Sequence, residues 1–249
     1  GFDKLFVYGN ATIDSTNNFD NMQIVGESRT KSVLTISATA SVNGTEFYEA
    51  EITGTLDGDS VCKHCTIGTV NYVNGVIEES LLKSNAVITL GGSQVAQILD
   101  CWSGQPGTGL PTIDMGGSGQ GLSMRNYHGG ITLQNKTGSD AVSIDLGSGQ
   151  VKLKDTVTNG TIVCRGVAEL IDVTPGKLFR SGTHNGATIV NEFTTQMLFH
   201  IFDVETGNWQ MVSNQMIFRD KDDNELFRCN LFDDLGDPSM DNVFKRERV

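Results

Sequence analysis

The sequence predicts an all-β protein: a parallel β-helix, or β-solenoid, followed by a small C-terminal β-rich module with one short helix. Three observations carry this prediction. Glycine is abundant and proline scarce, with 29 and 4 residues in a chain of 249. Apolar and polar residues alternate over short runs, which is the period of a half-buried strand. Short blocks of sequence also recur, which is typical of stacked repeats that bury their apolar faces against one another.

The clearest recurrence lies near the middle of the chain. Residues 113–120 read IDMGGSGQ, and residues 144–150 read IDLGSGQ. Successive side chains of a strand point to opposite faces, so Ile113 and Met115 share one face and Asp114 takes the other. We expect each block to begin an equivalent segment of a solenoid coil.

The elements upstream show the same pattern. Residues 1–20 hold one apolar run, at 5–8, and then a polar stretch, so we assign them to an N-terminal strand that caps the stack. The solenoid occupies residues 21–174. Within it, residues 52–56 align with residues 66–70 at a spacing of fourteen, which extends the repeat toward the N-terminus.

Periodicity stops near Pro175, and residues 175–249 are assigned to the C-terminal β module. Apolar residues at spacings of three and four over residues 192–204 predict its one helix. Alternating apolar runs predict strands at residues 209–212, 215–218 and 226–232. A polar hairpin turn is expected to join the last two.

Composition excludes several classes of function. The net charge of -12 argues against nucleic acid and against an anionic membrane surface, both of which need a basic face. No run of eighteen apolar residues is present, so no membrane insertion is expected. The chain opens on Gly1 without a basic and apolar leader, so we expect that its start was trimmed or that the ordered part begins mid-protein.

The five cysteines are an odd number and indicate reduced thiols rather than a disulfide framework. Cys62 and Cys65 resemble half of a zinc site, but no second pair at comparable spacing completes four ligands. We therefore expect no metal and no cofactor. Strand alternation predicts that one of the two thiols fills the core and that the other faces solvent or lies at a bend.

A catalytic hypothesis rests on the repeated aspartates. If Asp114 and Asp145 were equivalent positions on successive coils, their backbones would lie about 4.8 Å apart. Two carboxylates at roughly 5 Å are what a retaining glycosidase uses. The repetition also supports a second interpretation, because Asp172 continues the series and coil symmetry alone would produce it.

A binding hypothesis rests on a predicted loop. Residues 102–111 contain two of the four prolines, and solenoid insertions often lie on a binding face. Trp102 and Gln105 in this loop, with Tyr127, are candidates for contacting a carbohydrate or a protein partner. Alternatively, Trp102 simply covers the root of the loop.

Several segments together resemble a group of bacteriophage structural proteins with a β-helical body. The resembling segments cover most of residues 20–249 and include residues 99–107, 113–120, 125–127, 131–136, 142–146, 214–218, 228–233 and 243–246. The resemblance implies a tail or baseplate component that acts in the virion, such as a fibre, an adaptor or a receptor-contacting part. It also implies a homotrimer and other virion proteins as partners, and it supplies no catalytic residue.

Three functions therefore stand after the sequence. The first is a non-enzymatic structural protein of a virion. The second is a module that binds carbohydrate on the host surface, through Trp102, Gln105 and Tyr127. The third is a polysaccharide depolymerase on a β-helix, which would require Asp114 and Asp145 to form an acid pair.

Overall fold

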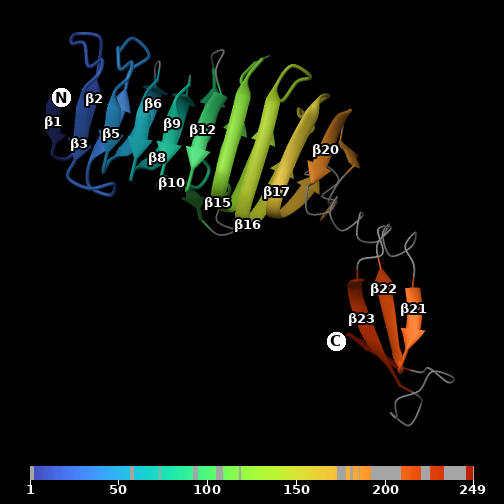
Figure 1. Ribbon diagram of the computed structural model, residues 1–249. Coiled ribbons are helices and arrows are strands. Elements are labelled where there is room, and N and C mark those ends of the chain that lie inside the picture. Colours follow the sequence, from blue (N-terminus) through green and yellow to red (C-terminus); the bar gives the residue numbers. More distant parts are fainter. Residues whose placement is uncertain are drawn as a thin grey trace. The chain divides into compact units, whose positions relative to one another are not determined.

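The computed structural model describes residues 3–56, 59–72, 74–91, 95–104, 109–117, 119–172, 178–179, 182–184, 186–191, 209–219, 225–232 and 245–248. The chain divides into two compact units, Gly1–Glu192 and Phe193–Val249. The first unit contains a sheet of 20 strands, nearly all paired in parallel, and the second a sheet of 4 antiparallel strands (Figure 1). The predicted β-solenoid followed by a small β-sheet is thus confirmed.

One column of parallel strands runs the length of the first unit. Each strand of this column pairs with the strand one coil further along. Its members are β1 (Lys4–Val7), β3 (Gln23–Gly26), β5 (Glu46–Tyr48), β7 (Val61–Lys63), β9 (Val76–Glu78), β12 (Val95–Leu99), the first parts of β15 (Gly121–Gln134), β16 (Ala141–Leu153) and β17 (Thr161–Asp172), and β20 (Ala187–Asn191).

The remaining sides of the coils are formed by further strands, which are also parallel. They are β2 (Ala11–Ile13), β4 (Val33–Ile36), β6 (Glu51–Leu56), β8 (Thr66–Tyr72), β10 (Leu81–Leu82), β11 (Val87–Leu90), β13 (Trp102–Ser103) and β14 (Thr112–Asp114), followed by the later parts of β15, β16 and β17. Two antiparallel strands, β18 (Leu178–Phe179) and β19 (Gly182–His184), pair with β17 and β20. The parallel pairing of β20 with β17 continues the stack beyond the boundary expected at residue 174.

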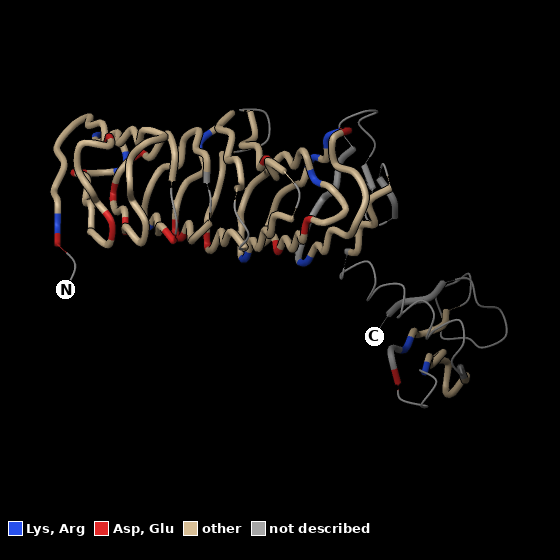
Figure 2. Tube along the Cα trace, turned by 90° about the horizontal axis from the view of Figure 1, so that it is seen from above, with Lys and Arg blue, Asp and Glu red and all other residues tan. Residues whose placement is uncertain are grey.

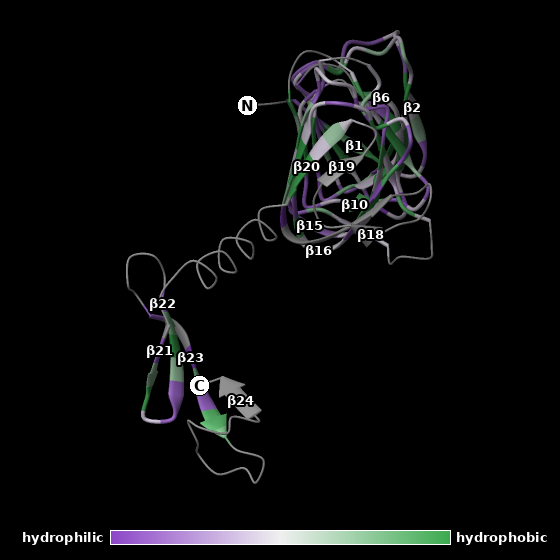
Figure 3. Cartoon of the chain, turned by 90° about the vertical axis from the view of Figure 1, so that its right-hand side faces the viewer, coloured by the Kyte–Doolittle hydropathy of each residue, from purple (hydrophilic) through white to green (hydrophobic). Residues whose placement is uncertain are grey.

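The core is a set of inward-facing apolar rows, in which each side chain lies opposite the equivalent one on the next coil. One row contains Phe47, Cys62, Ile77, Ile98, Met124, Ile144 and Cys164, all fully buried. Among the described charged residues only Lys136 and Asp140 are buried. Figure 2 marks the positions of lysine, arginine, aspartate and glutamate along the chain trace, and an end-on view shows strands surrounding a common interior (Figure 3). Alternation of apolar and polar residues therefore produces the core directly.

The coil length differs from the repeat seen in the sequence. Met124 lies opposite Ile144, and Leu133 opposite Leu153, so the coil here has 20 residues. The predicted spacing of fourteen upstream is also wrong: it is fifteen at Ile52, which lies opposite Ile67, and sixteen at Gly54, which lies opposite Val70. A slip of one residue would turn every side chain of a strand to the other face, so burial of the apolar residues selects the observed register.

Five successive coils turn their first corner at a non-glycine residue with a left-handed backbone. Successive corners carry φ values of 51°, 55°, 46°, 52° and 48°, at Glu49, His64, Glu79, Asp100 and Asn126. The bend interrupts the alternation of the strand, so the residue after each corner faces inward. These inward residues are Ala50, Cys65, Ser80, Cys101 and Tyr127, and all are fully buried.

One glycine is required by close packing of two coils. Gly149 has a φ of 120°, and a Cβ atom there would lie 1.4 Å from the carbonyl oxygen of Gly129. No other residue fits this position without moving the backbone of the neighbouring coil.

The second unit is a meander of β21 (Trp209–Val212), β22 (Gln215–Arg219), β23 (Glu225–Phe232) and β24 (Lys245–Arg248). Its first turn places Ser213 and Asn214 at φ values of 50° and 61°, which is the conformation of a tight two-residue hairpin. The first three strands match those predicted, whereas the sequence analysis missed β24. The predicted helix at residues 192–204 lies outside the described residues, and the described part of the chain contains no helix that could cross a membrane.

Candidate functional site: polar ladders and corner thiols

Asp114 is held in a polar ladder that crosses three coils. Its Oδ2 atom accepts a hydrogen bond from Gln134 Nε2 at 2.7 Å, and Gln134 Oε1 accepts one from Lys154 Nζ at 2.7 Å. The Oδ1 atom accepts from Asn135 Nδ2 at 2.8 Å and from the backbone N–H of Gly116 at 2.9 Å. Both carboxylate oxygens are therefore used in contacts that tie neighbouring coils together.

Asp145 lies in a different row of the stack. It is half-buried on β16 and lies opposite Arg165 of β17, whereas Asp114 lies opposite Gln134. Asp114 and Asp145 therefore do not lie opposite each other, and the expected pairing of these two residues is wrong. The two blocks are 31 residues apart, but the coil has 20 residues, so the same sequence pattern falls on different sides of the coil.

Trp102 is half-buried on β13, and its ring is covered on one face by a cation. The guanidinium carbon of Arg29 lies 5.3 Å from the ring centroid, which is the geometry of a cation–π contact. A sugar ring would have to displace Arg29 or use the opposite face. Trp102 is therefore already engaged with another side chain of the solenoid, whereas the alternative that it covers the root of the loop stays a prediction.

Tyr127 is fully buried and cannot contact a ligand on the surface. The left-handed bend at Asn126 turns its side chain inward, where the hydroxyl donates to the carbonyl oxygen of Gly130 at 3.4 Å. Burial raises the pKa of this phenol well above its usual value. Gln105 lies outside the described residues, so the expected group of Trp102, Gln105 and Tyr127 is not brought together in the described structure.

Cys62 and Cys65 are both fully buried, so neither thiol faces solvent, and the alternative that one of them lies at a bend fits Cys65, which directly follows the bend at His64. The bend at His64 resets the alternation and turns Cys65 inward. Cys65 Sγ donates to the carbonyl oxygens of Lys63, at 3.3 Å, and Phe47, at 3.4 Å. Within the described residues, no group of three or more histidine, cysteine, aspartate or glutamate side chains is arranged to hold a metal ion.

Equivalent corners carry either a serine or a cysteine, and both side chains make the same hydrogen bond. Ser80 Oγ donates to the carbonyl oxygen two residues earlier at 2.7 Å, and Cys101 Sγ does so at 3.2 Å. Burial raises the pKa of Cys65, Cys101 and Cys164 from 9.0 to about 12 in each case. These thiols are consequently held in the unreactive protonated form.

The sequence analysis missed Lys136, a fully buried lysine between β15 and β16. Its ammonium group donates to the carbonyl oxygens of Thr137, at 2.9 Å, and Asn159, at 2.8 Å. Burial lowers the pKa of Lys136, while the Coulombic effect of Asp140 raises it. A single lysine in a polar turn gives no signal of burial, because solvated lysines occur in the same setting.

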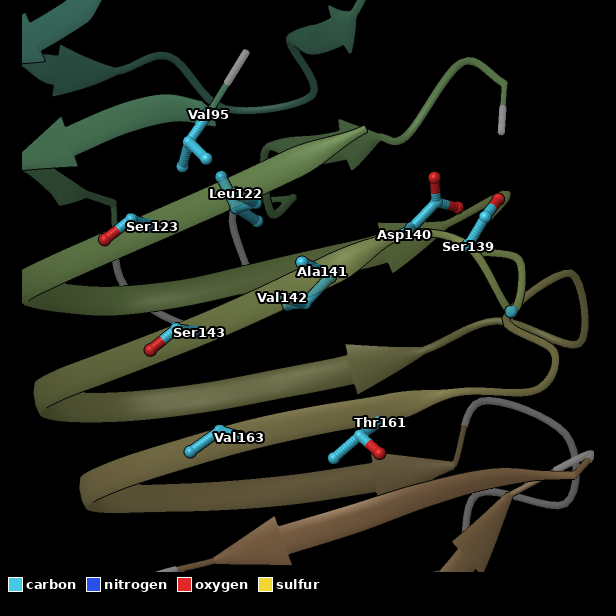
Figure 4. Close-up of a pocket in the computed structure, with 11 residues that line it drawn as sticks. Val95, Leu122, Ser123, Ser139, Asp140, Ala141, Val142, Ser143, Thr161 and Val163 are labelled. Atoms are coloured by element: carbon cyan, nitrogen blue, oxygen red, sulfur yellow. The ribbon is translucent and has the colours of Figure 1, made fainter. Parts of the chain in front are cut away.

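A shallow depression of about 590 Å³ lies on the outer face of the long column. Figure 4 shows its walls, formed by side chains from four successive strands, with small residues in the middle. Hydroxyl groups of Ser123, Ser143 and Thr161 line it, and Val95 stands at one side with 50% of its surface exposed.

The ionisable residue of the depression, Asp140, is buried and fully engaged. Its oxygens accept hydrogen bonds from the backbone N–H groups of Gln120, at 2.8 Å, and Thr137, at 2.6 Å, and from the Thr137 hydroxyl at 2.9 Å. The depression therefore offers hydroxyl and apolar contacts rather than a free acid or base. No protein-family model, curated protein or solved structure shows significant similarity to the chain.

Proposed function

We propose that the chain is a non-enzymatic structural component of a phage virion, associated with the tail or baseplate as a fibre, an adaptor or a receptor-contacting part. The observation that carries this proposal is the ladder of Asp114, Gln134 and Lys154, in which a candidate acid is used to join coils. The resemblance of the sequence to phage structural proteins supports the same role, and the assignment to a virion rests on that resemblance.

A stack of this kind suits a protein that acts outside the cell. Every inner strand is hydrogen-bonded on both edges, which protects the backbone from solvent and from pairing with other chains. Under the proposal the partners are other copies of the chain, as a homotrimer, and other virion proteins. Sedimentation equilibrium tests the first of these, because a trimer has the mass of three chains at all concentrations studied.

A host-surface carbohydrate-binding module is the second candidate function. The depression beside Val95 favours it, because Ser123, Ser143 and Thr161 provide hydroxyl groups that can hydrogen-bond to a saccharide. Replacing the exposed Ala141 at its centre with tryptophan would fill the hollow. That variant should lose saccharide binding if this site is used.

The test is incubation of the purified chain with surface polysaccharides from candidate bacterial hosts, measuring both retained binding and new reducing ends. The structural role predicts neither, and binding without cleavage would instead support the carbohydrate-binding module. New reducing ends would overturn both and would support a depolymerase. If cleavage occurred, Asp145→Asn and Asp114→Asn would then test whether either acid contributes.

A further inference from the structure

A hollow of about 310 Å³ lies on the outer face of β6, β8 and the chain that follows β10. Figure 1 shows these strands following one another in the stack, on a side of the coil other than the long column that carries the depression beside Val95. The polar residues and the glycine that line the hollow are Glu51, Thr53, Gly68, Thr69, Lys83 and Asn85. This lining suits a hydrophilic ligand rather than an apolar one.

A β-bulge opens the hollow. β8 has one residue more than β6 between their paired positions, because Gly68 and Thr69 together lie opposite Thr53. Bulges redirect side chains and are frequent beside functional sites. A Cβ atom at Gly68 would lie 2.7 Å from Thr53 Cγ2 and 3.6 Å from Glu51 Oε1, so only glycine leaves this space open. A glycine inside a strand often marks a place where a ligand approaches the backbone closely.

An ion pair crosses the hollow between two coils that are not adjacent. Glu51 lies opposite Thr66, which lies opposite Leu81, and Lys83 follows two residues later. Lys83 Nζ lies 2.6 Å from Glu51 Oε1, so the pair spans the coil that carries Gly68. The two charges neutralise each other, and the net charge of -12 on the whole chain disfavours anions. The hollow therefore favours a neutral ligand.

The ion pair leaves polar groups with unused hydrogen-bonding capacity. The side chain of Glu51 is 18% exposed, and its Oε2 atom accepts no hydrogen bond from any described residue. Lys83 uses one N–H group on Glu51, so further N–H donors remain on its ammonium group. Thr69 Oγ1 accepts from the backbone N–H of Val87 at 3.2 Å, which leaves its own O–H to donate. A ligand must both donate and accept hydrogen bonds to use all of these groups.

We propose that this hollow binds one neutral sugar residue of a saccharide. Adjacent hydroxyl groups of a sugar can donate to Glu51 Oε2 and accept from Lys83 at the same time, which neither an anion nor an apolar molecule does. A volume of about 310 Å³ is at the lower end for ligand sites, which suits a single sugar residue. The inference rests on the second candidate function, carbohydrate binding, and adds to it the class of sugar and a second site.

Affinity electrophoresis of the full chain through gels that contain dextran, mannan or galactan tests the proposal. At least one of these neutral polysaccharides should retard the wild-type chain. Glu51→Gln/Lys83→Met removes both charges together, so no buried charge is left unpaired. Its dissociation constant should rise at least about tenfold, because charge-assisted hydrogen bonds to the sugar are lost. Thr69→Tyr, at an exposed position, fills the hollow without changing the ion pair and should weaken binding as strongly.

Glu78→Gln/Lys63→Met is the matched control. Lys63 Nζ and Glu78 Oε2 also form an ion pair between coils, at 3.1 Å, and both side chains are 31% exposed, but neither residue lines the hollow. This variant should bind within about twofold of the wild-type affinity. Circular dichroism checks the fold of every variant.

Two results would overturn the proposal, and they differ in what they say about carbohydrate binding. Wild-type affinity in the folded Glu51→Gln/Lys83→Met and Thr69→Tyr variants would exclude this hollow but leave carbohydrate binding at the depression, which Ala141→Trp tests. Failure of all three neutral polysaccharides to retard the wild-type chain would exclude a neutral sugar altogether, and the proposed structural role would stand.

Discussion

The protein should become less stable at alkaline pH, and replacing the two corner thiols, Cys65 and Cys101, with serine should make this loss of stability smaller. Ser80 occupies the equivalent corner one coil away and donates to the carbonyl oxygen two residues earlier at 2.7 Å, as the thiols do at 3.3 and 3.2 Å. Serine therefore fits both positions. The double variant Cys65→Ser/Cys101→Ser changes the titration of the core while retaining this hydrogen bond.

The size of the effect can be worked out from the direction of the pKa shifts. Burial raises the pKa of Cys65 and Cys101 from 9.0 to about 12, so the folded state holds protons that the unfolded state releases. This stabilisation is fully present below pH 9 and is lost as the pH rises from 9 toward 12. At pH 10 the titration of each thiol lowers the free energy of unfolding by about 1.4 kcal/mol, provided that the folded pKa lies well above 10.

The assay is urea unfolding at pH 8 and pH 10, monitored by far-UV circular dichroism. Between these values the double variant should lose about 2.7 kcal/mol less than the wild-type chain. Other groups that titrate in this range, such as Tyr127 and Lys136, are common to both proteins and cancel in the comparison. Ser80→Ala alters the same row of corners without removing a thiol, so it should show the wild-type loss. An equal loss in the double variant and the wild-type chain would refute the assignment of these thiols to the core.

Two further predictions concern packing between coils, and thermal or urea unfolding measures both. Gly149→Ala should destabilise the first unit by roughly 3 kcal/mol or more, because the new Cβ atom would clash with the carbonyl oxygen of Gly129. Gly91→Ala is the control: a Cβ atom there would have no neighbouring atom within 4 Å, so the stability should change by less than about 0.5 kcal/mol. Similar stabilities for the two variants would contradict the observed contact of coils at Gly149. Lys136→Met should cost roughly 2–3 kcal/mol, because the buried ammonium group and its hydrogen bonds to two carbonyl oxygens are lost. Lys31→Met, at a side chain that is 64% exposed, should cost less than about 0.5 kcal/mol. A neutral Lys136→Met would show that the ammonium group is not buried.

The fold class could be predicted from the sequence because its causes are local. Alternation of apolar residues determines which side chains enter the core, and glycine permits close approach of coils, as at Gly149. The first three strands of the second unit were predictable for the same reason, whereas β24, with the sequence KRER, has no apolar alternation and was missed.

The register and the corners could not be predicted in this way. The blocks that begin at Ile113 and Ile144 resemble each other, but hydrogen bonding pairs Ile113 with Leu133 and Ile144 with Cys164. The corners at Glu49 and Glu79 give no sequence signal for a left-handed backbone, and the preference of His, Asp and Asn for it is too weak to locate a corner. Each such bend turns the next side chain to the face opposite the one that strand alternation predicts. This reversal explains why Tyr127 and Cys65 face the core, and the 20-residue coil explains why the expected acid pair is not formed.

The most direct test of the account is the contact of spin labels placed on neighbouring coils. Ser123 lies opposite Ser143 on the outer face, so nitroxides attached at Ser123→Cys and Ser143→Cys should touch and show spin exchange in the paramagnetic resonance spectrum. Labels at Asp114→Cys and Asp145→Cys should show none, because these positions lie in different rows. Exchange in the second pair and its absence in the first would mean that the coil has the 31-residue period of the sequence blocks. The two acids would then be neighbours, and the candidate acid pair of the catalytic hypothesis would be restored.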